Sequence, residues 1–134
     1  MLVHFPAALL PIDLVFNVMS EYLTFKPLNE AAYYCLTAGV LGGWLAMAAG
    51  LFDFIRFIKP GSPAIKRVML HLAIQVAVII CFSLLLALEY KHPDWMNSPT
   101  VLILCSKAIL LLAMFCGNYV GGEIVFRYIA KEFQ

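Results

Sequence analysis

The sequence predicts an all-α membrane protein, a single domain spanning residues 1–134 and folded as an up-and-down bundle of four transmembrane helices. The chain is 63% hydrophobic, whereas soluble domains are about 45–50% apolar. Its mean hydropathy is +0.91, and charged residues make up only 13%. A small chain this apolar cannot cover its own surface with polar groups. At about 20 residues per span, the chain holds four spans with short connections, so any chemistry must lie among the helices.

The first span is expected at about residues 5–22, with Pro6 in the first turn, where its missing N–H costs nothing. Such apolar runs are too long for barrel strands, so helix is the predicted spanning structure. Residues 26–29, with the sequence Lys-Pro-Leu-Asn, end this span, and Asn29 is the expected N-cap of the next. The second span is expected at about residues 31–58.

The strongest turn signal in the chain follows the second span: residues 59–63 read Lys-Pro-Gly-Ser-Pro. The third span is expected at about residues 64–90. A second break at residues 92–99 carries two prolines and precedes a fourth span at about residues 100–128.

The basic residues predict the orientation. Six lie at the end of the bundle that holds both chain termini, and three lie elsewhere. The six are Arg56, Lys59, Lys66, Arg67, Arg127 and Lys131, and the three are Lys26, Lys91 and Lys107. Because basic residues accumulate on the cytoplasmic side, both termini are expected in the cytoplasm.

Small residues recur at helical spacing on the second span, at Gly39, Gly43, Ala46 and Gly50. Gly117 and Gly121 repeat a G-x-x-x-G spacing on the fourth span. Such stripes let helix backbones approach closely in lipid. They indicate either tight packing within the bundle or a face that accepts a cofactor or a partner subunit.

Four ionisable residues, one from each span, are expected at one depth near the cytoplasmic end: His4, Asp53, His71 and Glu123. Ionisable groups inside a membrane are costly and usually face the bundle interior, so this set is a candidate site. The alternative is that each residue reaches water or headgroups at a helix end, with the acids paired to neighbouring arginines.

The two histidines lie on spans expected to sit diagonally, an arrangement that suits His4 and His71 as the axial ligands of a b-type haem. Asp53 and Glu123 would then orient a ligand ring or a haem propionate. The same four residues are also a plausible ligand set for a non-haem metal, or a proton relay.

Two further charges lie deeper in the spans. Asp13 and Lys107 approach from opposite ends and are expected to form a structural ion pair if the first and fourth spans are neighbours. On the fourth span, Lys107, Asn118 and Gly121 share one face, while Cys105, Cys116 and Glu123 share nearly the opposite one. Only one face can line the bundle centre, so the other is expected to meet a partner subunit.

Short motifs at the helix ends resemble a known family. They are Val3-His4-Phe5-Pro6, Gly50-Leu51-Phe52-Asp53-Phe54, Arg67 with His71, and Gly121-Gly122-Glu123-Ile124-Val125. Together they resemble DUF2231, a bacterial family of predicted four-helix membrane proteins of unknown function. In that pattern an arginine directly precedes the third-span histidine, whereas Arg67 lies four residues before it. The resemblance implies a bacterial cytoplasmic (inner) membrane location and groups His4, Asp53, His71 and Glu123 in one pattern.

These observations lead to three candidate functions. The first is a small subunit resembling a b-type cytochrome, which binds haem b and passes electrons within a larger membrane complex, with quinone as a candidate partner. The second is a non-catalytic accessory or assembly subunit. The third is a metal-binding or proton-handling membrane protein. The sequence shows no nucleophile–base set and no phosphate-binding loop, which argues against a stand-alone enzyme. The net charge of +1 gives no indication of nucleic-acid binding. Lipid and other membrane subunits are the expected partners.

Overall fold

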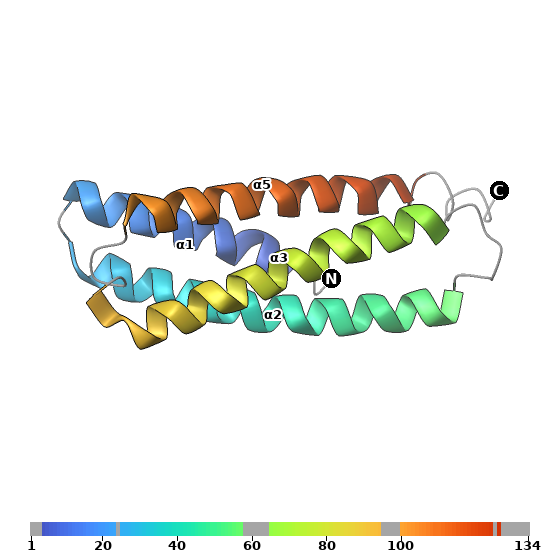
Figure 1. The fold of residues 1–134 in the computed structure, drawn as a ribbon, viewed down its shortest axis with the longest axis horizontal. Coiled ribbons are helices and arrows are strands. Elements are labelled where there is room, and N and C mark those ends of the chain that lie inside the picture. Colours follow the sequence, from blue (N-terminus) through green and yellow to red (C-terminus); the bar gives the residue numbers. More distant parts are fainter. Residues whose placement is uncertain (1–3, 24, 58–64, 95–99, 125, 127–134) are drawn as a thin grey trace.

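The computed structural model describes residues 4–23, 25–57, 65–94, 100–124 and 126. Four long helices account for nearly all of them. They are α1 (His4–Leu23), α2 (Pro27–Phe57), α3 (Ile65–Lys91) and α5 (Val101–Ile124). The predicted all-α class with four helices is confirmed (Figure 1). The turn at residues 59–63, most of the second break and the last residues of the fourth span lie outside the described residues.

Three of these helices, α2, α3 and α5, are long and apolar enough to cross a membrane. Within the described part of the chain, α1 does not meet the same standard. It is 20 residues long and buries three polar side chains, at Asp13, Asn17 and Ser20. The chain is therefore an all-helical protein with three helices that can span a membrane and one shorter helix, with a buried polar stripe, packed beside them.

The second helix begins earlier than the sequence predicted. It starts at Pro27, and Asn29 is a buried residue of its first turn rather than its N-cap. The backbone N–H of Asn29 donates to the Lys26 carbonyl at 3.0 Å. Proline suits the first helical turn because its fixed φ is already helical and its missing N–H has no partner to lose there. The sequence predicts a break at this proline, whereas the proline starts the helix.

Neighbouring helices run antiparallel (Figure 1), and their packing closes a ring of four helices. Packing contacts join α1 to α2, α2 to α3, α3 to α5 and α5 to α1. In the described part of the chain, the backbones of α1 and α3 do not approach each other as neighbouring helices do, so these two helices occupy a diagonal, as expected from the up-and-down order.

The helices differ in length, and this difference opens one end of the bundle. Helix α2 has 31 residues and α1 has 20, so at 1.5 Å per residue α2 extends about 16 Å further. Because the two helices meet near Leu23 and Pro27, the extra length of α2 lies beyond the start of α1. There α2, α3 and α5 continue without α1 beside them (Figure 1).

The hydrophobic core lies at mid-length and draws on all four helices. Its seven buried side chains, called the apolar layer below, are Leu10, Leu36, Val40, Val78, Phe82, Leu111 and Met114. Phe82 and Leu36 are fully buried. Burying such side chains stabilises a soluble protein by about 1.5–3 kcal/mol each, but in lipid the gain comes mainly from close packing.

Candidate functional site

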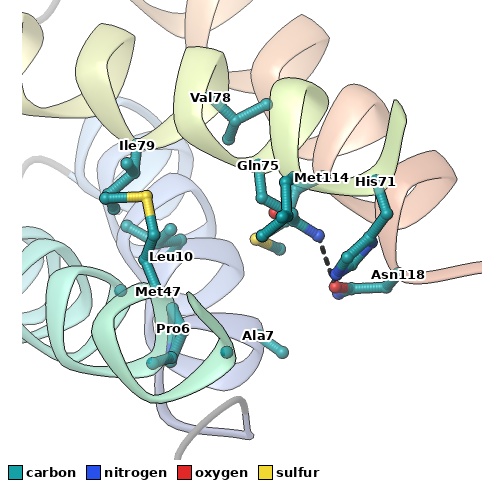
Figure 2. A pocket seen from close by; sticks show the side chains of 14 residues that line it. Pro6, Ala7, Leu10, Met47, His71, Gln75, Val78, Ile79, Met114 and Asn118 are labelled. Atoms are coloured by element: carbon teal, nitrogen blue, oxygen red, sulfur yellow. Dashed lines mark hydrogen bonds between the residues drawn. The ribbon is translucent and has the colours of Figure 1, made fainter. Parts of the chain in front are cut away.

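A pocket lies where α1 begins and all four helices come together (Figure 2). Its cavity volume is about 120 Å³. Pro6 and Ala7 line it from α1, and small residues of α2, namely Gly43, Ala46 and Gly50, line it with Met47. Its polar side is formed by His71 and Gln75 of α3 and by Asn118 of α5. An apolar pocket with a few convergent polar groups is the usual form of a small-molecule site.

Two glycines of α5 leave space for the polar side chains of α3 to pack against its backbone. The Nδ1 atom of His71 lies 2.7 Å from the carbonyl oxygen of Gly117. A carbonyl oxygen only accepts hydrogen bonds, so Nδ1 carries the proton, and in the neutral ring Nε2 keeps its lone pair. A Cβ built on Gly121 would lie 2.8 Å from Cε1 of the same ring. The G-x-x-x-G spacing of α5 therefore provides the space that the His71 ring occupies.

Beside His71, the amide of Gln75 donates to Asn118 Oδ1 at 2.7 Å, which joins α3 to α5 a second time. Gln75 lies one turn after His71, and both side chains face the same groove of α5. On α1, Pro11 lies inside the helix, one turn after Ala7 of the pocket lining. Proline has no N–H, so the carbonyl of Ala7 has no donor four residues ahead of it. The polar side chains of the pocket therefore come from α3 and α5.

The four residues expected at one depth do not share one environment. His71 lines the pocket. Glu123 forms an ion pair with Arg67, with Oε1 and Nη1 2.7 Å apart. His4 and Asp53 are exposed, and neither is among the residues that line the pocket. Across the described ranges, no group of three or more His, Cys, Asp or Glu side chains is placed to hold a metal ion.

A second polar centre lies deeper in the bundle. The ammonium of Lys107 on α5 is 2.9 Å from Asp13 Oδ1 of α1 and 2.8 Å from Glu89 Oε1 of α3. The side chains of Lys107 and Asp13 are 0% exposed, and that of Glu89 is 5% exposed. The structure thus brings Asp13 and Lys107 together and adds a second carboxylate. These three residues are called the buried charge cluster.

Two residues of α1 extend this polar centre. The Asn17 amide donates to Asp13 Oδ1 at 2.8 Å and to the Asp13 carbonyl at 3.1 Å. The Ser20 hydroxyl donates to the Asn17 carbonyl at 2.7 Å. The spacing of Asp13, Asn17 and Ser20 places them on one stripe of the helix, and this spacing is the signal in the sequence that indicates a shared polar face. Glu89 was missed because it lies two residues before the end of α3, where a charged residue is ordinary.

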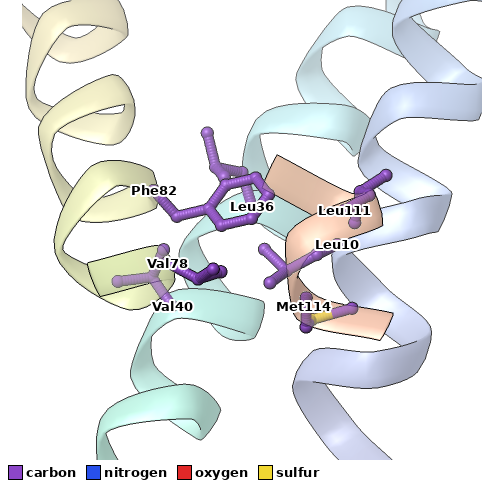
Figure 3. Close-up of a cluster of buried hydrophobic side chains, with 7 residues drawn as sticks. All are labelled: Leu10, Leu36, Val40, Val78, Phe82, Leu111 and Met114. Atoms are coloured by element: carbon purple, nitrogen blue, oxygen red, sulfur yellow. The ribbon is translucent and has the colours of Figure 1, made fainter. Parts of the chain in front are cut away.

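The apolar layer, drawn in Figure 3, lies between the pocket and the buried charge cluster, and three of its residues, Leu10, Val78 and Met114, also line the pocket. Along three helices, a pocket residue, a layer residue and a cluster residue follow in the same spatial order: Ala7, Leu10 and Asp13 on α1; His71, Val78 and Glu89 on α3; Asn118, Leu111 and Lys107 on α5. The bundle therefore holds two polar centres with an apolar layer between them.

The structure also shows which face of α5 is internal. Lys107 is buried and Asn118 and Gly121 are half-buried, whereas Cys105 and Cys116 are exposed. The small residues of α2 serve two purposes. A Cβ on Gly39 would meet Leu10, and one on Gly43 would meet Ile79, so these two glycines allow close packing. A Cβ on Gly50 would meet nothing within 4 Å, so this glycine borders open space beside the pocket.

Apolar helices with buried polar centres define a small helical membrane protein. A family model described as "Predicted membrane protein (DUF2231)" matches residues 1–132. The chain belongs to this family of predicted membrane proteins of unknown function. No curated protein and no solved structure matches it.

Proposed function

We propose that the protein is a membrane subunit of four spans, both termini in the cytoplasm, that binds a b-type haem at the His71 pocket and passes electrons within a larger complex in the bacterial inner membrane. The observation that carries this proposal is the His71 ring, whose Nδ1 is hydrogen-bonded to a backbone carbonyl beside an apolar pocket. Ligating histidines commonly donate their other ring N–H to a carbonyl or carboxylate, which fixes the tautomer and orients the ring.

The proposal includes α1 as the fourth span. Its polar residues Asp13, Asn17 and Ser20 are all buried, so they do not face lipid. At 1.5 Å per residue its 20 residues extend about 30 Å, the thickness of a bilayer hydrocarbon core. A span that turns its polar stripe toward its neighbours is compatible with lipid.

The donor chemistry of the pocket fits a haem, but the small volume of the cavity requires that the haem extend beyond it. The imidazole Nε2 of His71 is the kind of neutral donor that holds haem iron. A cavity of about 120 Å³ is smaller than the roughly 300–1,000 Å³ of typical ligand pockets. A macrocycle would therefore have to extend past Gly50, on the side where the glycine meets nothing within 4 Å. When bound, haem would accept and release one electron.

The remaining residues have supporting functions in this proposal. Gly121 leaves room for the His71 ring, and Gly117 accepts its Nδ1 proton in a hydrogen bond. His4, at the start of α1 and two residues before Pro6 of the pocket wall, is the proposed second ligand. Asp53 and Glu123 are the carboxylates proposed to hold ligand rings or propionates in place.

A non-catalytic accessory function is the second candidate, and one observation favours it. Glu123 is already paired with Arg67 at 2.7 Å, and these side chains are 25% and 39% exposed. An exposed ion pair of this kind contributes at most about 1 kcal/mol to stability and is common at helix ends. In this function, the polar residues near the termini only stabilise the ends of the helices.

The test is the absorption spectrum and the haem content of the full chain, purified in mild detergent from cells supplied with haem. Replacing His71 by Ala is expected to remove bound haem, whereas the same change at exposed His92, at the far end of α3, should keep it. Gly50→Leu provides a second test, because it fills the open side of the pocket without changing His71. Circular dichroism shows whether each variant folds. If His71→Ala and Gly50→Leu both keep the wild-type spectrum and metal content, the haem proposal fails and the accessory function is preferred.

A further inference from the structure

The charges of the buried cluster do not balance. Asp13 and Glu89 each carry −1 when ionised, and Lys107 carries +1, so the three sum to −1 in a region where the side chains are 0–5% exposed. An unbalanced charge inside a low-dielectric bundle costs several kcal/mol. The cluster therefore gains stability by taking up one positive charge.

One oxygen is placed to receive that charge. Asp13 Oδ1 accepts hydrogen bonds from Lys107 and Asn17, whereas Asp13 Oδ2 is buried and has no hydrogen-bond partner among the described residues. The Lys107 ammonium already lies between the two carboxylates, where a metal ion would have to bind. A proton needs only a single lone pair and no ligand shell. A proton on Oδ2 neutralises the cluster without displacing Lys107.

The groups that face Asp13 come from every helix. Glu89 approaches from α3, Lys107 from α5 and Asn17 from its own helix α1. Cys35 of α2 lies within electrostatic reach of the same carboxylate. Of these, only Glu89 is both a carboxylate and close to a helix end, two residues before α3 stops. It is thus the group best placed to pass protons between Asp13 and water.

We propose that Asp13, Glu89 and Lys107 form a proton-binding site that holds one exchangeable proton inside the bundle, carried on Asp13 Oδ2. On release, the Oδ2–H bond breaks, its electron pair stays on Asp13, and the proton passes by way of Glu89 to water at the end of α3. On uptake the same steps run in reverse. Lys107 keeps its charge throughout, and no oxidation or reduction takes place. The site is independent of whether the His71 pocket binds haem.

Infrared spectroscopy of the full chain in lipid vesicles tests the proposal through the C=O stretch of a protonated carboxyl group. Unaltered protein at neutral pH is expected to show one such group per chain. Asp13→Asn should abolish this band because it removes the carboxyl. Glu89→Gln should abolish it too, because Asp13 and Lys107 then balance as an ordinary ion pair. Glu21→Gln, which removes an exposed carboxylate on α1, should leave the band unchanged.

Labelling provides a measurement that needs no variant. Carbon-13 in every aspartate should shift the band of the unaltered chain, since Asp13 is the buried aspartate, whereas the other two, Asp53 and Asp94, are exposed. The proposal is overturned if unaltered protein has no protonated carboxyl, if the aspartate label leaves the band in place, or if a folded Glu89→Gln variant keeps it.

Discussion

Two adjacent glycines of α5 allow a matched test of the packing around His71. A Cβ on Gly121 would lie 2.8 Å from Cε1 and 3.1 Å from Nδ1 of the His71 ring, whereas a Cβ on Gly122 would meet nothing within 4 Å. Both Gly→Ala changes gain about 0.5–1 kcal/mol because alanine is the better helix former. Only the Cβ added at Gly121 would lie too close to a neighbouring side chain, the His71 ring.

The size of the effect follows from the distances. To restore ordinary contact at 3.4 Å, the ring must move by roughly 0.6 Å, which disturbs the bond of 2.7 Å from Nδ1 to the Gly117 carbonyl. Losing this bond costs about 0.5–1.5 kcal/mol, and overpacking costs about 1–3 kcal/mol. After the helix-propensity gain, Gly121→Ala should destabilise the protein by about 1–3 kcal/mol, while Gly122→Ala should stabilise it by up to about 1 kcal/mol.

The assay is reversible unfolding in mixed micelles titrated with sodium dodecyl sulfate and followed by circular dichroism. A double-mutant cycle identifies the cause: in a His71→Ala background, Gly121→Ala should keep only its helix-propensity gain and stabilise the protein by up to about 1 kcal/mol. The coupling free energy should then be about 1.5–4 kcal/mol. Equal stability of the Gly121→Ala and Gly122→Ala variants, or a coupling free energy near zero, would refute the packing described for this groove.

Other predictions concern the cluster, the topology and the assembly. Lys107→Met leaves two buried carboxyls without their cation and should lower the free energy of unfolding by about 3–5 kcal/mol in the same assay. Lys66→Met, at an exposed position on α3, should change it by no more than about 0.5 kcal/mol. Equal values for the two variants would contradict the cluster geometry. A reporter fused to the C terminus should be active only in the cytoplasm, given the six-to-three basic bias, and activity only outside would reverse the orientation. Gentle purification from native membranes through a tag on this chain should recover further subunits, and a monodisperse monomer would argue against a hetero-oligomer.

The sequence determined the four helices well, because each is a long apolar run between strong turn signals. The sequence also predicted the pairing of Asp13 with Lys107, since the up-and-down order makes α1 and α5 neighbours and the two residues approach from opposite ends. Both inferences need only the order of the helices along the chain and the depth of each residue within its span. The start of α2 was misplaced because proline opens a helix as readily as it ends one.

The sequence did not predict the partners that depend on rotation about a helix axis. Depth alone grouped Glu123 with His4, Asp53 and His71, but its ion pair with Arg67 depends on the rotation of α5 about its axis. Glu89 joined the buried charge cluster because α3 packs directly against α5, and no local pattern around Glu89 encodes that contact. Likewise, the pairing of Gln75 with Asn118 depends on the register between α3 and α5, which is set by close packing at Gly117.

The apolar layer has a consequence for the membrane as an electrical barrier. Its seven side chains are leucine, valine, phenylalanine and methionine, and none of them can relay a proton. A chain of water molecules needs polar partners at each step, and a closely packed layer of this kind offers none. Protons that enter at the buried charge cluster and water that enters at the pocket therefore stay at their own ends of the bundle. A cell can then keep polar centres at two depths in this protein while the ion gradient across its membrane is preserved.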